Sequence, residues 1–185
     1  MNRFLVTTLF VVSSVLSSRA QDDAPRNFFS ILRPFKEAPL VSGLEAYRII
    51  VSPDDSAPLL ISVAVTPDGG EATAKRLKRR GYAYGGIAEA NRFLITKSEL
   101  SEIREVFRNA KLQELPIVGR PTAVEDGDGS VTICLHAPTW YIEQIVDGSY
   151  KRVEQYCPAE RSLIEIGFVM LRISRFKIPK EQLFQ

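Results

Sequence analysis

The centre of the chain alternates short apolar runs with turn residues, a pattern typical of β-strands joined by tight turns. Residues 45–51 and 59–66 are rich in branched apolar side chains, so both are predicted strands. Residues 67–70, of sequence Pro-Asp-Gly-Gly, favour a turn because proline fixes φ and glycine tolerates positive φ. Residues 71–80 fit either a helix with Gly81 as its C-cap or the second strand of a hairpin. The turn chemistry favours the strand.

The next residues continue this extended pattern. Residues 81–86 are rich in glycine and tyrosine and are predicted as a turn, and residues 88–96 are a further predicted strand. The remaining extended segments are residues 130–136, 139–146 and 149–156.

Helical periodicity occurs in two segments. Residues 97–112 begin with a capping box in which Thr96 is the N-cap and Glu99 reaches back to it, and Pro116 is expected to end the helix. Residues 161–173 read as a second, buried helix. The apolar stripe of the first helix is Leu100, Ile103, Val106, Phe107 and Ala110, and that of the second is Leu163, Ile166, Met170 and Ile173.

These elements predict an α+β fold in which an antiparallel sheet of five or six strands packs against two helices. The expected organisation is a signal peptide at residues 1–20, a polar leader and aromatic-rich linker at 21–44, a single α+β domain at 45–176, and a polar tail at 177–185. The aromatic residues 27–36 could dock on the core as a turn of helix or form a linker that mediates assembly.

The N-terminus has the pattern of a secretory signal. Arg3 precedes an uncharged run at residues 4–16, and Ser18 and Ala20 place small side chains where a signal peptidase would cut, before Gln21. The run is too short for a permanent membrane anchor, which needs about 20 apolar residues. We therefore expect a secreted or periplasmic protein with no transmembrane anchor after cleavage.

Charge and composition exclude several classes of function. The 185 residues carry 24 Lys and Arg, of which cleavage would remove Arg3 and Arg19, so that 22 basic residues would face 22 acidic ones. A balanced chain has no general attraction to nucleic acid. One histidine and two cysteines are too few for a zinc finger or an iron–sulfur cluster, and no cofactor is expected.

The two cysteines, Cys134 and Cys157, are expected to form a disulfide bond in an oxidising compartment; buried thiols or one reactive thiol are the alternatives. Asp147-Gly148 predicts a hairpin that places Cys157 just beyond its paired residues. If residues 130–136 flank that hairpin, Cys134 lies about 10 Å away, whereas a disulfide needs Cα atoms within about 7 Å. The bond then requires the chain after Cys157 to fold over the sheet, or another strand order.

Candidate chemistry is sparse. His136, with Glu143, could form an acid–base pair. Asp126 and Asp128 lie in a glycine-rich loop whose oxygens could hold Ca²⁺, although the EF-hand spacing fails and a solvated turn is the simpler interpretation. No nucleophile-elbow motif accompanies these residues.

Two groups of residues could instead bind a partner. The first is a basic run with neighbouring aromatic residues, which would attract an acidic protein, lipid headgroups or an anionic glycan. The second is a set of aromatic residues on the predicted hairpin, which more often pack a sheet than bind a ligand. The candidate binding residues are Lys75, Arg76, Lys78, Arg79, Arg80, Tyr82, Trp140 and Tyr150, beside Tyr84, Tyr141 and Tyr156.

The second half of the chain resembles small exported bacterial proteins of unknown function. The shared elements are a capped helix, an Asp-Gly before a strand (Asp128-Gly129), a Tyr-x-Glu strand (Tyr141 to Glu143), a Gly-x-Tyr strand (Gly148 to Tyr150), and Cys157-Pro158 before a last helix. This resemblance supports the α+β fold and implies no activity.

Three functions remain compatible with the sequence. The first is a non-catalytic protein of the cell envelope that binds a protein or another envelope component. The second is a small hydrolase-like enzyme that uses His136 with Glu143, with metal assistance at Asp126 and Asp128. The third is a structural accessory unit that assembles through residues 27–36.

Overall fold

The structure is a computed structural model that describes residues 26–40, 44–53, 56–80, 83–119, 124–125, 131–132, 137–158 and 160–177. The predicted signal peptide and its cleavage site lie outside these residues, as does the tail beyond Lys177. Within the described parts, no helix is long and apolar enough to cross a membrane.

Six long strands and three helices form the main body. The helices are α1 (Arg26–Phe35), α2 (Lys97–Asn109) and α3 (Arg161–Ser174), and a 3₁₀ turn, η1 (Leu112–Glu114), follows α2. The long strands are β1 (Ala46–Ser52), β2 (Leu59–Thr66), β3 (Gly69–Arg80), β4 (Ala83–Ile95), β8 (Thr139–Val146) and β9 (Ser149–Tyr156). The short strands are β5 (Val118–Gly119), β6 (Val124–Glu125) and β7 (Val131–Thr132).

The protein is α+β, with a seven-stranded sheet in the order β4-β3-β2-β1-β8-β9-β5. The six long strands are antiparallel to one another, and β5 runs parallel to β9, so the sheet is mixed. The expected number of strands, five or six, and the expected number of helices, two, are therefore both too low. The two residues of β5 are too few to produce a pattern, and Pro34 conceals the helical character of α1.

Residues 130–136 were considered as a strand beside the β8–β9 hairpin, and the structure places β1 there instead. β8 lies between β1 and β9, and the only strand described in that segment is β7, which pairs with β6 in a separate two-stranded sheet. The hairpin β8–β9 therefore has β1, which is distant in sequence, as its neighbour. The objection to a disulfide that rested on residues 130–136 as a flanking strand no longer applies.

Turn chemistry predicted the hairpins better than it predicted strand ends. Asp147 and Gly148 have φ of 51° and 72°, and Val146 pairs with Ser149, as a two-residue turn with positive φ requires. Residues 71–80 lie in β3, as the turn favoured. The turn predicted at 81–86 is wrong for residues 83–86, which belong to β4, and residues 81 and 82 lie outside the described part of the chain.

The capping box at Thr96 and Glu99 is confirmed. The helix ends earlier than Pro116, because Lys111 adopts a left-handed conformation (φ 48°) and the chain tightens into η1. The predicted stripe of α2 is buried, with Val106 half-buried, as is that of α3. Periodicity therefore identified the buried faces of both helices.

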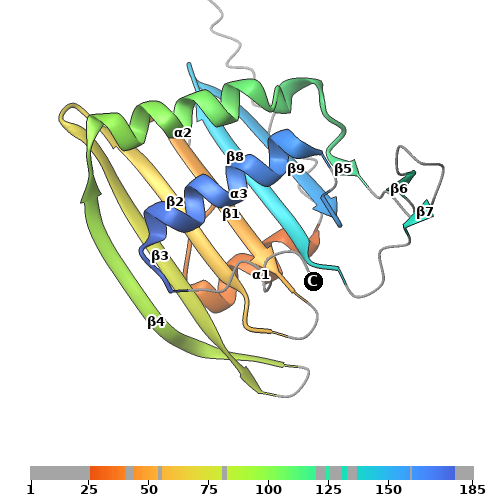
Figure 1. The fold of residues 1–185 in the computed structure, drawn as a ribbon. Helices are drawn as coiled ribbons and strands as arrows, with labels where there is room; N and C mark the ends of the chain where they lie inside the picture. The colour runs from red at the N-terminus through yellow and green to blue at the C-terminus, as the bar shows by residue number, and fades with distance from the viewer. Residues whose placement is uncertain are drawn as a thin grey trace, which may run out of the picture.

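The two faces of the sheet are covered differently. Figure 1 shows α2 and α3 lying across one face, which we call the two-helix face, and α1 lying on the other, the α1 face. The main core fills the space under α2 and α3. A smaller cluster packs α1 against the sheet through Leu32, Phe35, Ile50, Leu60, Leu77 and Tyr141. Residues 27–36 therefore dock on the protein itself, the first of the two alternatives for that segment.

Candidate functional site

A network of charged side chains is buried in the middle of the α1 face. Arg48 of β1 is 3% exposed and Glu143 of β8 is 0% exposed, and the two residues are direct partners in the strand register. Arg48 Nη1 donates to Glu143 Oε2 at 3.1 Å, and the hydroxyl of Tyr150 donates to Glu143 Oε1 at 2.7 Å. Both carboxylate oxygens of Glu143 are therefore engaged inside the protein.

The segment after α1 extends this network. Arg48 Nη2 donates to the carbonyl of Ala38 at 2.9 Å and lies 3.9 Å from a Glu37 carboxylate oxygen. Lys75 donates to the same carboxylate at 2.5 Å and to the carbonyl of Phe35, the last residue of α1, at 3.0 Å. A cation at a helix C-terminus is favourable. Lys75 thus holds α1 in place.

Burial raises the pKa of Glu143, although Arg48, the Tyr150 hydroxyl and Arg152 all act to lower it. Burial together with the nearby Glu143 also raises the pKa of Tyr150. Such shifts occur at catalytic sites and in structural ion networks alike. Here the Glu143 carboxylate has no exposed surface, and its hydrogen bonds join β8 to Arg48 of β1 and to Tyr150 of β9.

The other candidates for catalysis and metal binding cannot be placed. His136, Asp126, Asp128 and Cys134 lie outside the described residues. Among the residues that are described, no cluster of three or more His, Cys, Asp or Glu side chains could hold a metal ion.

The strand β3 separates the basic run onto two faces. Lys75 is turned inward onto the α1 face, whereas Arg76 on the two-helix face pairs with Glu89 at 2.8 Å and lies over the Phe176 ring. Lys78 and Arg79 are exposed. Arg80 ends β3, and Tyr82 lies outside the described residues. The exposed part of the run is therefore the distal end of the β3–β4 hairpin.

The aromatic residues of the β8–β9 hairpin do not form one surface. Trp140 is 0% exposed in the main core under α3, whereas Tyr150 binds Glu143 on the opposite face of the sheet. Trp140 and Tyr150 were candidates for a common binding face, and their positions on opposite faces of the sheet exclude one; the packing role that aromatic strand residues more often have applies to Trp140. Trp140 is a core residue.

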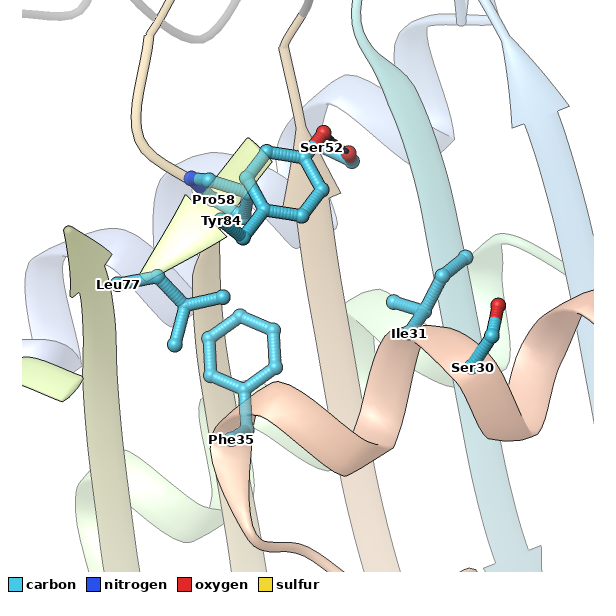
Figure 2. Close-up of a pocket in the computed structure, with 7 residues that line it drawn as sticks. All are labelled: Ser30, Ile31, Phe35, Ser52, Pro58, Leu77 and Tyr84. Atoms are coloured by element: carbon cyan, nitrogen blue, oxygen red, sulfur yellow. Dashed lines mark hydrogen bonds between the residues drawn. The ribbon is translucent and has the colours of Figure 1, made fainter. Parts of the chain in front are cut away.

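The structure adds a pocket that the sequence did not suggest. It lies between the side of α1 and the strand ends of the α1 face, and it has a volume of about 170 Å³. Figure 2 shows Leu77 and Phe35 facing each other, with Tyr84 and Ser52 together at one end. Its lining residues are Ser30, Ile31, Phe35, Ser52, Pro58, Leu77 and Tyr84.

One signal of the buried network was present in the sequence. Arg48 and Glu143 each stand inside an otherwise apolar strand, and a charge in such a position requires a partner of opposite sign. The pocket left no such signal, because its residues come from five separate segments.

Comparison with known proteins assigns neither feature: no protein-family model matches the chain, and no curated protein shows significant similarity to it.

Proposed function

We propose that this protein is exported, loses residues 1–20, and acts as a non-catalytic binding or accessory protein of the cell envelope. The distal end of the β3–β4 hairpin is its contact surface for an acidic partner protein: by strand alternation Lys78 lies on one side of the hairpin, and Arg79 lies with Tyr84 on the other. The observation that carries this proposal is the exposure of Lys78 and Arg79 on the part of β3 that extends beyond its pairing with β2.

The hairpin supports this role by its shape. β2 pairs with β3 only as far as Arg76, so the residues beyond it pair with β4 alone. Figure 1 shows β3 and β4 continuing past the end of β2. A projecting pair of strands can reach a partner without disturbing the core. Lysine and arginine on such an edge also discourage uncontrolled strand pairing.

The positive charge is concentrated at the distal end of the β3–β4 hairpin. The predicted mature chain is balanced overall, so a cluster of basic residues on one projecting element produces a positive surface without general attraction to polyanions. Complementary charge of this kind raises association rates and selects partners. An acidic protein surface is the partner that fits, with Tyr84 supplying an aromatic contact that is 46% exposed.

Catalysis by Glu143 and His136 has less support. Glu143 is enclosed by Arg48 and Tyr150, so reaching a substrate would require the sheet to open. Replacing Glu143 would also disturb the fold. His136→Ala is therefore the cleaner test of the enzyme alternative, and a loss of cellular function in that variant with the fold intact would favour it.

The proposal is tested by crosslinking and affinity purification from envelope extract, using the full-length chain with a C-terminal tag. We expect a stoichiometric partner with the wild type and its loss with Lys78→Glu/Arg79→Glu. The matched control is Lys97→Glu/Arg108→Glu, which makes the same charge change on exposed positions of α2 and should retain the partner.

The two control substitutions have opposite effects on the helix dipole, because Lys97 begins α2 and Arg108 lies in its last turn. Their influence on stability should therefore largely cancel. Equal loss of the partner in both double variants would show that net charge alone decides the contact and would contradict the assigned surface.

A further inference from the structure

The pocket on the α1 face has the size and lining of a site for one small apolar group. A cavity of about 150 Å³ lined by leucine, isoleucine and phenylalanine accommodates benzene in another protein. The volume here is about 170 Å³, and Phe35, Leu77 and Pro58 supply apolar walls. A single aromatic ring therefore matches the volume of this pocket.

The walls of the pocket are held in place by the rest of the fold. Phe35 and Leu77 are buried, and Lys75 anchors the end of α1 through the Phe35 carbonyl. The backbone of Leu77 donates to the carbonyl of Pro58 at 3.0 Å, which joins two of the lining segments. A pocket with such walls is largely formed before a ligand binds, which reduces the cost of ordering on binding.

One end of the pocket is polar. The hydroxyls of Ser52 and Tyr84 lie 3.1 Å apart and share a hydrogen bond in which either can be the donor. Two hydroxyls carry two protons, and their mutual bond uses one of them. The second proton is available to an acceptor at the rim of the pocket.

A positive charge lies beside this polar end. Arg79 is directly opposite Tyr84 in the β3–β4 register, beyond an irregularity of the pairing between Leu77 and Arg79. Residues that are paired across two strands share a face, so Arg79 lies on the same face as Tyr84, which lines the pocket. Arg79 is exposed beside Tyr84, so it carries a positive charge near the polar end of the pocket. Guanidinium binds carboxylate through charge-assisted hydrogen bonds.

We propose that this pocket binds a small aromatic carboxylate, with the ring between Phe35, Leu77 and Pro58 and the carboxylate at the rim against Arg79 and the Ser52–Tyr84 hydroxyl pair. The class is an aromatic ring separated from its carboxylate by a short link, as in an arylacetate. This site shares Arg79 and Tyr84 with the proposed partner contact, but it binds a small molecule, and purified protein without any partner is sufficient to test it.

The experiment is an NMR titration of the purified protein, expressed as the full-length chain, with phenylacetate. Benzyl alcohol supplies the ring without charge, and acetate supplies the charge without the ring. We expect phenylacetate to bind with a Kd of the order of 1 mM, consistent with so small a ligand. Its shifts should centre on the Leu77 and Ile31 methyl groups. Benzyl alcohol should bind more weakly at the same place, and acetate should cause no shift there.

Two variants separate the parts of the site. Arg79→Gln should weaken phenylacetate about three- to fivefold and leave benzyl alcohol within about twofold, because only the charged contact is lost. Ile31→Trp, at the half-buried edge of α1, fills the pocket and should weaken both ligands more than about tenfold. Arg108→Gln on α2 is the matched control and should change neither Kd.

Three results would overturn the proposal. The first is an absence of phenylacetate binding to the folded wild type. The second is shifts confined to another part of the protein, and the third is unchanged binding in a folded Ile31→Trp variant. Loss of the acidic partner on Lys78→Glu/Arg79→Glu is scored in a different assay, so either proposal can fail while the other stands.

Discussion

Gly167 of α3 lies against the indole ring of Trp140 on β8, so closely that a Cβ atom at position 167 would stand 2.2 Å from the Cη2 atom of the ring. No real side chain is accommodated at that separation without movement of the helix or the ring. This contact determines how near α3 can approach the sheet, and the main core lies beneath it.

Replacing this glycine with alanine should destabilise the protein by about 2 kcal/mol, because overpacking a core outweighs the helix preference for alanine. Chemical denaturation measures the change. Gly86→Ala is the matched control: a Cβ atom at position 86 on β4 would have nothing within 4 Å, so we expect less than about 0.5 kcal/mol. If Trp140→Phe fails to recover part of the loss in the Gly167→Ala background, the indole contact is not its cause.

The buried pair of Arg48 and Glu143 should respond strongly to removal of one partner. Glu143→Gln should cost roughly 2–4 kcal/mol, since it leaves the Arg48 charge buried without its carboxylate. Glu102→Gln, which removes the carboxylate of an exposed pair with Arg172, should cost less than about 1 kcal/mol. Urea unfolding of both variants measures these two changes in the free energy of unfolding.

A double variant tests whether the cost of each single substitution comes from the unpaired charge that it leaves. Arg48→Met/Glu143→Leu replaces both charges with apolar groups, and it should be more stable than either single variant because no unpaired charge remains. A double variant that is less stable than both single variants would contradict this view of the network.

The ion pair between Glu45 and Arg104 should make stability depend on pH in the acidic range. Arg104 donates to both carboxylate oxygens, at 2.7 and 2.6 Å, and these bonds hold the pKa of Glu45 below its ordinary value of 4.5. A carboxyl with a lowered pKa contributes stability above the unfolded value, and that contribution is lost as pH falls through the folded pKa.

Glu45→Gln should therefore lower the free energy of unfolding by about 0.5–1 kcal/mol at pH 7, because the pair is partly exposed. The difference between wild type and variant should shrink below about pH 4.5. Thermal unfolding across pH 3 to 7 provides the comparison, and a difference that stays constant with pH would argue against the assigned pair.

Cys157 is expected to bond to Cys134 in the exported protein. Denatured protein should then show no reactive thiol until a reductant is added, and reduction should lower stability by about 3 kcal/mol under the loop-entropy account. Two thiols that react without reductant in freshly exported protein would refute the bond. Intact mass from the same sample checks cleavage after Ala20.

Local signals predicted most individual elements correctly. Asp147-Gly148 predicted a turn that the structure contains, and Thr96 with Glu99 predicted the start of α2. Both depend on residues within a few positions of one another, where backbone preferences and capping bonds act directly. β7 lies within the extended segment predicted at residues 130–136, but its pairing with β6 involves two residues of each strand, too few to leave a pattern in the sequence.

The candidate sites depended on contacts between distant residues. Lys75 belongs to a run of residues that the sequence suggests is a basic surface. Successive side chains of a strand point to opposite faces, however, and Lys75 points to the α1 face, where it holds α1. Trp140 and Tyr150 were separated onto two faces for the same reason. The pocket forms only where Tyr84, Ser52 and α1 lie close together, and no local sequence pattern predicts that proximity.

The sequence by itself determined the α+β class, both long helices with their buried stripes, and the hairpins, because periodicity, capping and turn chemistry act over short distances. Only the tertiary structure decided that β1 lies between β2 and β8, that Arg48 meets Glu143, and that α1 covers the second face. Those arrangements result from burying apolar surface and pairing charges between segments far apart in the chain, and such energies are absent from any single segment.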